Sequence, residues 1–406
     1  MPLPARAADD AALAHAKDLL SHHILIDGHN DLPWAIREAK AAPGDVAAYD
    51  LRTKTSGQTD IPRLKAGRVG GQFWSVYVPG EATEGWARMQ LEQIELARRV
   101  VERYPDTFAL ALTADDAEKA FKAGKIASFI GMEGGHVLEN SLGALRAYYA
   151  LGARYMTVTH NTSLAWADSA TDPPARHGGL TKFGEEVVRE MNRLGMLVDL
   201  SHAAPETMRA ALRVSEAPVI FSHSSARAIC DVPRNVPDDV LRLLPKNGGV
   251  VMIAFVTGFV SPEAAKILMP AFQEFNQRSK TLASEKERDA LWKEILAPLK
   301  VPKATIGQVA DHVEQVRRVA GADHVGLGAD YDGNDTWPIG LEDVSMYPNL
   351  FAELIRRGWS DADLVKLAGA NVLRALRRAE GVAKRLQAER PPSTATLGSL
   401  DGPPAK

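Results

Sequence analysis

The chain has one cysteine, Cys230, among its 406 residues. A single thiol excludes disulfides within the chain and any metal site built from several thiolates, so we expect Cys230 to be a small buried side chain. The sequence also lacks an apolar run of the ~18 residues that a membrane span requires. Its 48 basic and 51 acidic residues form no block of one sign and leave a net charge of −3. These absences argue against a nucleic-acid partner and against a membrane anchor.

Eight apolar runs divide the chain and have the length of strands. They are rich in Val, Ile, Met and Phe with little polar alternation, which is typical of strands buried on both faces of a parallel sheet. One-sided helical patterns lie between them, as in TKFGEEVVREMNRLG and TIGQVADHVEQVRRVAG. This alternation predicts a (β/α)8 TIM barrel of the metal-dependent hydrolase type, a fold that tolerates more than ~400 residues with insertions. The expected strands lie near 23–27, 70–78, 126–132, 154–159, 196–200, 218–222, 249–256 and 324–329.

Six of these runs end in a side chain that can bind a metal or move a proton. The C-terminal ends of barrel strands form one face of the molecule, where catalytic side chains from several strands meet. Six such endings in distant segments therefore predict one shared site, and the residue types point to a metal-dependent hydrolase. The residues are His29, Asp31, Glu133, His160, His202, His223 and Asp330.

The types and spacing of these residues suggest individual roles. His29 and Asp31 stand at i and i+2, on the same side of an extended chain, and suit a divalent ion, although the segment also contains good turn formers. A lone carboxylate such as Glu133 is costly to bury unless it is paired, and its two oxygens can serve two ions ~3.5–4 Å apart. His202 and His223 each follow Ser at the end of successive strands. One such His is usually a core residue, but the matched pair favours a shared metal.

His160 and Asp330 are expected beside the bound water and substrate. Asp330 is a candidate to take the proton of an attacking water and pass it to the leaving amine. His160 is a candidate to donate to the oxygen that becomes negative in the transition state. Asp332 is the alternative to Asp330, which we favour because it stands nearer the end of its strand.

The ends of the chain and one insertion fall outside the barrel pattern. We expect residues 1–20 to be a flexible N-terminal segment, residues 21–385 to form the barrel domain, and the Pro- and Ser-rich residues 386–406 to be a disordered tail. A charged helical insertion at 261–305 predicts a lid, a contact between two copies of the chain, or a solvated extra helix. The start of the chain leaves two locations open, the cytoplasm or export with a signal removed.

Seven blocks of the sequence resemble the membrane (renal) dipeptidase family of the amidohydrolase superfamily, in that family's order. They are DGHNDLPW, GMEGGH, TVTHN with WADS, VDLSH, PVIFSHSSARAI, RNVPDDVL and GLGADYDG. The resemblance implies two zinc ions, one held by His29 and Asp31, the other by His202 and His223, with Glu133 shared. It also implies substrate contacts from His160, Arg234 and Asp330.

The resemblance implies a dipeptidase in which a hydroxide bridging the two zinc ions attacks the peptide bond, with dipeptides that end in a D-residue among the substrates. Arg234, which would otherwise be interpreted as a surface arginine, is then expected to hold the C-terminal carboxylate of the dipeptide by two hydrogen bonds. Phe259 stands where animal members have a tyrosine that helps to hold that carboxylate. Two alternatives remain: an amidohydrolase that acts on N-acyl amino acids, lactones or lactams, and a metal-binding scaffold without activity.

Overall fold

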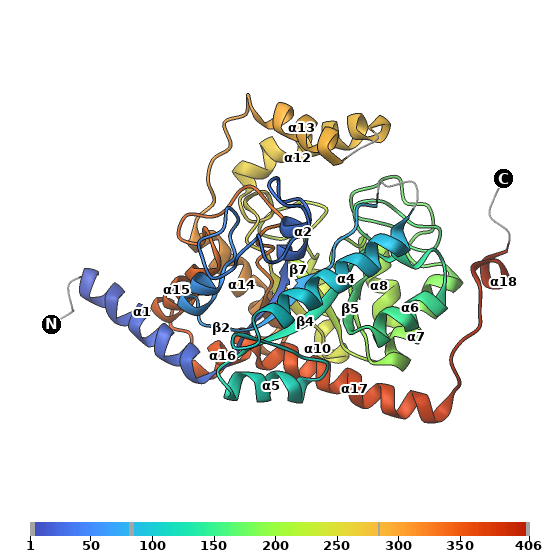
Figure 1. Cartoon of the computed structure of the whole chain (residues 1–406), viewed down its shortest axis with the longest axis horizontal. Coiled ribbons are helices and arrows are strands. Elements are labelled where there is room, and N and C mark those ends of the chain that lie inside the picture. The colour runs from blue at the N-terminus through green and yellow to red at the C-terminus, as the bar shows by residue number, and fades with distance from the viewer. Residues whose placement is uncertain (1–4, 81–84, 283–284, 403–406) are drawn as a thin grey trace.

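The computed structural model describes residues 5–80, 85–282 and 285–402 and has a closed parallel barrel at its centre (Figure 1). Eight strands pair in the order β2-β1-β9-β8-β7-β6-β5-β4, and a further pairing of β2 with β4 closes the ring. The predicted (β/α)8 fold is therefore confirmed. The barrel strands are β1 Leu25–Asn30, β2 Val69–Ser75, β4 Ile126–Glu133, β5 Ala153–Thr157, β6 Leu197–Asp199, β7 Val219–Ser224, β8 Val250–Ile253 and β9 Val325–Leu327, all of them buried along their length.

A ninth strand, β3 Phe108–Leu110, was not predicted. It pairs with the first residues of β4, while β5 pairs with the last residues of β4 from Ile130 onward. Because β2 pairs with the middle of β4, β3 shares the other edge of that strand with β5 and adds nothing to the ring. Only Phe108 of its three residues is buried, so the segment is too short and too exposed to show a strand pattern.

Helices cover the outside of the barrel, and each predicted helical pattern forms one. Polar side chains start several of them: Thr181 accepts from the backbone N–H of Gly184 at the start of α7, and Ser360 accepts from that of Asp363 at the start of α16. The sequence pattern TEGWARMQLEQIELARRVVERY also predicts a helix, and its first two residues lie outside the described part of the chain. The helices around the barrel are α4 Trp86–Arg103, α5 Ala114–Lys122, α6 Leu142–Ala150, α7 Lys182–Leu194, α8 Pro205–Val214, α14 Ile306–Ala320, α15 Tyr347–Arg356, α16 Asp361–Val365 and α17 Asn371–Glu389.

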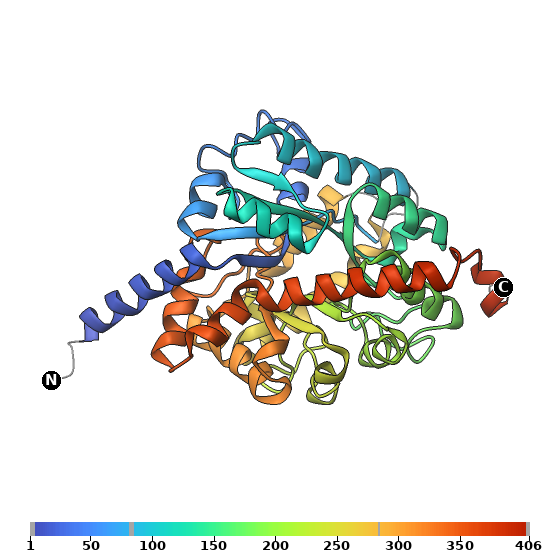
Figure 2. The same ribbon diagram turned by 90° about the horizontal axis from the view of Figure 1, so that it is seen from below.

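Shorter helices lie in the loops between strand and helix. They are α2 Leu32–Arg37, α3 Ile61–Ala66, α9 Asp238–Leu241, α10 Leu244–Asn247 and α11 Thr257–Val260. Viewed from below, α17 runs across the end of the barrel at which the strands begin (Figure 2). The other end, where the strands finish, faces the insertion at the top of Figure 1.

The described residues near both ends of the chain include helices, where the sequence suggested irregular segments. Helix α1, Ala5–His22, packs on α15 and buries Ala16 and Leu20. This apolar face is too small to be recognised in the sequence, but it is large enough to hold α1 against α15. The described part of the tail, up to residue 402, includes helix α18, Leu397–Asp401. Asp401 accepts hydrogen bonds from the Thr181 hydroxyl and from the Lys182 backbone, which joins the tail to the start of α7.

The insertion at 261–305 folds into two helices above the mouth of the barrel, α12 Pro262–Arg278 and α13 Glu285–Leu296 (Figure 1). Its residues 283 and 284 lie outside the described part of the chain. We call α12 and α13 together the cap. The cap lies over the mouth of the barrel, and its role as a lid stays a prediction.

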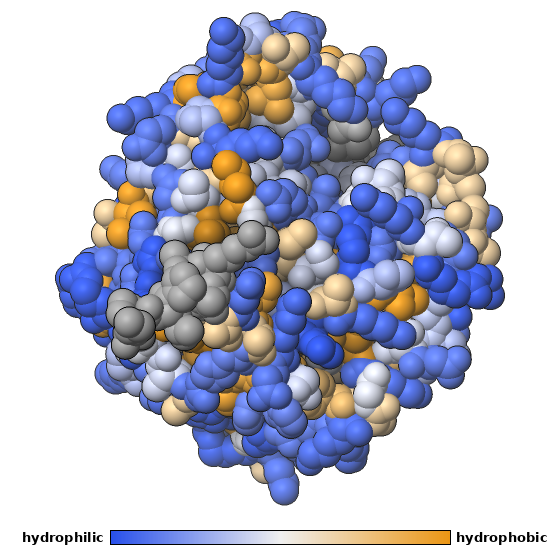
Figure 3. Space-filling model, turned by 90° about the vertical axis from the view of Figure 1, so that its left-hand side faces the viewer, coloured by the Kyte–Doolittle hydropathy of each residue, from blue (hydrophilic) through white to orange (hydrophobic). Residues whose placement is uncertain are grey.

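Hydrophilic residues cover most of the face drawn in Figure 3, and hydrophobic residues gather there only in small groups. The large apolar side chains that are exposed in the described residues stand singly: Leu91, Leu151, Leu243 and Ile339. In the described part of the chain, no helix has both the length and the apolar character needed to cross a membrane.

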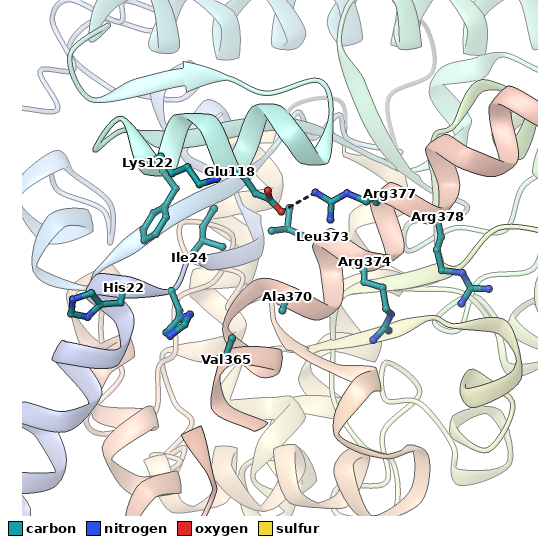
Figure 4. Close-up of a pocket in the computed structure, with 12 residues that line it drawn as sticks. His22, Ile24, Glu118, Lys122, Val365, Ala370, Leu373, Arg374, Arg377 and Arg378 are labelled. Carbon is teal, nitrogen blue, oxygen red and sulfur yellow. Dashed lines mark hydrogen bonds and ion pairs between the residues drawn. The ribbon is translucent and has the colours of Figure 1, made fainter. Parts of the chain in front are cut away.

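A cavity of about 420 Å³ lies at the end of the barrel where the strands begin (Figure 4). Its lining includes Ile24, which precedes β1, and Lys122, which precedes β4, together with arginines of α17. Arg377 forms an ion pair of 2.8 Å with Glu118 across this cavity. Glu118 is the one carboxylate among the lining residues, and this ion pair neutralises its charge. None of the predicted site residues lines this cavity.

Candidate metal centre

The predicted site residues come together at the C-terminal ends of the strands. A cavity of about 370 Å³ lies there, and its lining includes seven of them: Asp31, Glu133, His160, His202, His223, Arg234 and Asp330. His29 is fully buried beside this cavity, with its Nε2 atom 3.2 Å from Oδ2 of Asp31. The eight residues belong to loops and strands that are up to 301 positions apart, so only the closed barrel unites them.

Glu133 lies at the centre of the cluster, with each carboxylate oxygen facing different imidazoles. Its Oε2 atom is 3.4 Å from Nε2 of His29. Its Oε1 atom is 3.1 Å from Nε2 of His202 and 3.4 Å from Nε2 of His223. Burial alone would raise the pKa of Glu133, but the three imidazoles outweigh it and hold the pKa well below the usual range. The carboxylate is therefore an anion shared between two groups of nitrogen atoms.

The second nitrogen of each of these imidazoles is held by a hydrogen bond. The Nδ1 atom of His29 lies 2.8 Å from the Tyr155 hydroxyl. Asn161 Oδ1 lies 3.1 Å from Nδ1 of His202. Such a fixed second nitrogen is typical of histidines that bind metals, because it sets the tautomer and the orientation of the ring.

His223 is held in the same way by a longer chain of polar groups. Its Nδ1 atom is 2.9 Å from the hydroxyl of Ser222, which donates to Oδ2 of Asp199 at 2.6 Å. Since the hydroxyl proton is directed at the carboxylate, Ser222 is left to accept the Nδ1 proton of His223. The Nε2 atom of His223 then carries a lone pair. Asp199 also accepts from the backbone of Ser201 and Ser222, which fixes its position at the end of β6.

The donor set fits a cation. The Nε2 atoms of His202 and His223 are 3.0 Å apart, and their Nδ1 protons are directed at Asn161 and Ser222, so two lone pairs face each other. Burial keeps the pKa of both imidazoles well below the usual range, so neither is protonated at neutral pH. Two facing lone pairs beside a carboxylate repel one another, and a divalent ion between such nitrogen and oxygen atoms removes the repulsion. The oxygen and nitrogen ligands on the His29 and Asp31 side suit the same kind of ion.

His160 differs from the other three histidines. Its Nε2 atom is 3.8 Å from Oε1 of Glu133, near enough for a metal position shared with Glu133 and His202. However, its buried Nδ1 atom has no hydrogen-bond partner among the described residues, so nothing sets its tautomer. The ring instead packs against that of Tyr77, with 5.1 Å between centroids. This difference favours contact with a substrate over metal ligation.

Asp330 and Asp332 follow β9 in the left-handed region, with φ of 68° and 63°. Such angles are uncommon for residues with a side chain and are often found at functional sites. Asp330 lies within reach of a metal position formed with His29 and Asp31, and burial raises its pKa well above the usual range. Asp332 instead accepts from the backbone of Gln58, at 2.7 Å. The structure thus engages Asp332 in a loop contact.

Arg234 is buried beside the cavity, with 4% of its surface exposed. One guanidinium nitrogen, Nη2, donates to the backbone oxygen of His223, and the other, Nη1, has no partner among the described residues. The ring of Phe259 lies 5.1 Å from the guanidinium carbon. Burial lowers the pKa of Arg234 to about 10, so the group is still charged at neutral pH. A buried cation with a free N–H group suits an anionic part of a substrate.

The sequence analysis missed the residues that support the imidazoles. These residues are Tyr155, Asp199 and Ser222, which belong to apolar strands. A polar side chain in such a strand indicates a buried contact, but the strand that supplies the other group can be distant in the sequence. Asn161 follows His160 directly and belongs to the same quoted block. Their roles depend on the closed barrel and could not be assigned before it was seen.

A parallel barrel with buried His, Asp and Glu groups at its C-terminal face is typical of metal-dependent hydrolases. Residues 13–390 match the membrane dipeptidase family, peptidase family M19. This match covers nearly the whole chain, and the protein belongs to that family. The resemblance seen in the sequence is therefore confirmed.

Solved structures share this fold. The chain is similar to the probable dipeptidase PvdM from Pseudomonas aeruginosa, with a TM-score of 0.80, 24% identity, and coverage of 92% of this chain and 100% of that one. It is similar to dipeptidase AC, a metallopeptidase of family M19, with a TM-score of 0.71, 25% identity, and coverage of 88% and 99%. A metallopeptidase from Rhodobacter sphaeroides gives a TM-score of 0.70, 24% identity, and coverage of 88% and 99%.

Proposed function

We propose that this member of the family is a metallo-dipeptidase that uses two divalent ions, preferably zinc. His29 and Asp31 hold one ion, His202 and His223 hold the other, and Glu133 gives one carboxylate oxygen to each. The observation that carries the proposal is the division of the Glu133 carboxylate, whose Oε2 atom faces His29 while its Oε1 atom faces His202 and His223. A single ion would leave one of these sides without a cation.

When bound, the two ions would acidify a water for attack on the peptide carbonyl. The residues of the chain then orient the substrate and move protons. Asp330 accepts the proton of the attacking water and delivers it to the leaving amine. The imidazole of His160, next to Glu133, donates to the carbonyl oxygen as negative charge develops there. Arg234 binds the C-terminal carboxylate, which restricts the enzyme to substrates that end close to the cleaved bond.

We infer that dipeptides with a D-residue at the C-terminus are among the substrates. The similar metallopeptidase from Rhodobacter sphaeroides was solved with a phosphinate mimic of the dipeptide L-Ala-D-Ala. The cavity here, at about 370 Å³, falls within the range of ~300–1,000 Å³ that is usual for small-molecule sites. Its buried Arg234 supplies the positive charge that a free carboxylate requires.

Replacement of Asp330 by Asn tests the proposed proton transfer. The amide has nearly the same shape but cannot accept and release the proton, so kcat for L-Ala-D-Ala should fall by ~10²–10⁴. Metal content should stay at the wild-type level, because in this proposal Asp330 is not a ligand. Loss of metal from Asp330→Asn would make Asp330 a ligand and contradict the mechanism. Hydrolysis of N-acyl amino acids or lactams by the wild type, without hydrolysis of dipeptides, would favour another amidohydrolase reaction.

A further inference from the structure

The cavity above the candidate metal centre has a polar floor and an apolar roof. Asp31, Glu133 and the histidines lie on the floor. The roof comes from α11 and from the cap, and its apolar members are Phe259, Leu268, Met269, Phe272, Phe275, Trp292 and Leu296. Arg288 is the one charged side chain of the cap among the described lining residues, and it donates to the backbone oxygen of Leu282, which lies between the two cap helices.

An aromatic roof of this kind can simply be the core of the insertion, but the burial pattern argues otherwise. The two cap helices are joined by Ala271, Leu291 and Ile295, which are buried. Phe272 and Trp292 stay only partly buried. Trp292 packs against this buried group, and its ring lies edge to face with those of Phe275, at 5.4 Å between centroids, and Phe272, at 6.4 Å. The cap therefore satisfies its own packing and still presents aromatic surface to the cavity.

The outward side of the cap has the opposite character. Gln273 and Lys293 are exposed there, and Arg278 bridges Glu274 at 2.8 Å and Glu294 at 2.7 Å. These polar and charged side chains stand in solvent, whereas the apolar side chains of the two helices line the cavity. The apolar face of the cap is thus directed at the substrate cavity.

We propose that the substrates of this enzyme carry a bulky apolar or aromatic side chain, which binds beneath the cap against Phe272 and Trp292. This inference rests on the proposed dipeptidase function and adds the class of dipeptide. A small dipeptide such as L-Ala-D-Ala leaves the aromatic roof in contact with water, whereas a Leu or Phe side chain covers it. The roof thus selects for apolar volume, while Arg234 and the metal ligands act on the parts that all dipeptides share.

The test is kcat/KM for a set of dipeptides that differ in one side chain: L-Ala-D-Ala, L-Leu-D-Ala, L-Phe-D-Ala and L-Ala-D-Phe. The best apolar substrate should exceed L-Ala-D-Ala by at least ~10-fold, since each additional buried methylene is typically worth that much in a hydrophobic pocket. Phe272→Ala and Trp292→Ala should each reduce this preference. Trp292→Phe should restore most of it.

Gln273→Ala and Lys293→Ala are matched controls, because they alter exposed positions on the same two helices. Both should keep the wild-type preference, and thermal unfolding should show that all variants fold. Equal turnover of the four dipeptides by the wild type would overturn the inference and leave the dipeptidase function intact. A preference unchanged in both Phe272→Ala and Trp292→Ala would also overturn it. Failure to cleave any dipeptide would remove the proposed function itself and the inference with it.

Discussion

Gly333 offers a sharp test of how closely the two carboxylates of the site are positioned. A Cβ atom at this residue would lie 2.2 Å from Oδ2 of Asp31 and 2.6 Å from Oδ1 of Asp330. Since real Cβ atoms keep at least 3.0 Å from such neighbours, Gly333→Ala requires a shift of about 0.8 Å, and the end of the Asp31 side chain is the group that we expect to move. The backbone of Gly333 is not in the left-handed region, so the clash itself is the perturbation.

A displacement of about 1 Å in a reacting group can cost ~10²-fold in rate. We therefore expect kcat/KM for dipeptides to fall ~100-fold in Gly333→Ala, with weaker retention of metal on dialysis because Asp31 is a proposed ligand. Gly381→Ala is the control. Gly381 lies in α17 with no neighbour within 4 Å of the added atom, so this change should leave kcat/KM unaltered and raise stability by ~1 kcal/mol.

The measurement is steady-state kinetics with L-Ala-D-Ala or the preferred dipeptide, together with metal analysis after dialysis. If Gly333→Ala keeps wild-type kcat/KM and wild-type metal content, the positions of Asp31 and Asp330 are not critical. The roles assigned to both residues would then be wrong.

Two further predictions concern substrate binding and pH. Arg234→Ala should lower kcat/KM for free dipeptides at least ~10-fold and reduce the discrimination against C-terminally amidated dipeptides, because a bidentate hydrogen-bonded pair is lost; Arg234→Lys keeps the charge without the fork and should recover part of the rate. His312 accepts from the Ala226 backbone through Nδ1, and its Nε2 lies 3.2 Å from the backbone oxygen of Val260, as the neutral ring allows. Burial lowers its pKa to about 4, below the ordinary ~6.5, so the unfolded state binds more protons than the folded state between these values. The free energy of unfolding should therefore fall by on the order of 3 kcal/mol as the pH is lowered through this window, and denaturant titrations should show a smaller fall in His312→Gln.

One result would contradict each of these two predictions. Equal cleavage of free and amidated dipeptides by the wild type would show that Arg234 does not bind the carboxylate. An identical pH dependence of unfolding in the wild type and His312→Gln would show that the imidazole does not titrate differently in the two states.

The sequence was sufficient to predict the eight barrel strands, because strands buried on both faces are continuous apolar runs. It was also sufficient to predict that His29, Glu133 and Asp330 lie close together, since a polar residue that ends such a run lies at the catalytic face of a barrel. Strand β3 was beyond reach, because three residues cannot show a period and only one of them is buried. Strand β3 pairs with the first residues of β4, which β5 leaves free because it pairs only with the last residues of that strand. This offset between strands is not visible in the local sequence.

The contacts that support the site could not be predicted for a related reason. Tyr155 lies 126 residues from His29, and Asp199 acts on His223 through Ser222 on another strand. Each of these residues is visible in the sequence as a polar residue in an apolar segment. Their partners, however, are set by the register of neighbouring strands, which the local pattern does not contain.

The helices near the ends of the chain could not be predicted for a different reason. Helix α1 and the tail dock through small apolar areas and single polar contacts, such as the hydrogen bonds from Thr181 and Lys182 to Asp401. The composition of these segments resembles that of flexible ones. What holds them in place is the surface of the finished barrel, which is a property of the whole fold.

The metal content of the purified protein tests the central claim most directly. Protein prepared without chelator under zinc-replete conditions should contain close to two equivalents of divalent metal per chain by elemental analysis. Glu133→Gln should lower that number, whereas the control Gly381→Ala should not. A wild-type maximum of one equivalent would contradict the sharing of Glu133 between two ions and, with it, the binuclear site proposed for this protein.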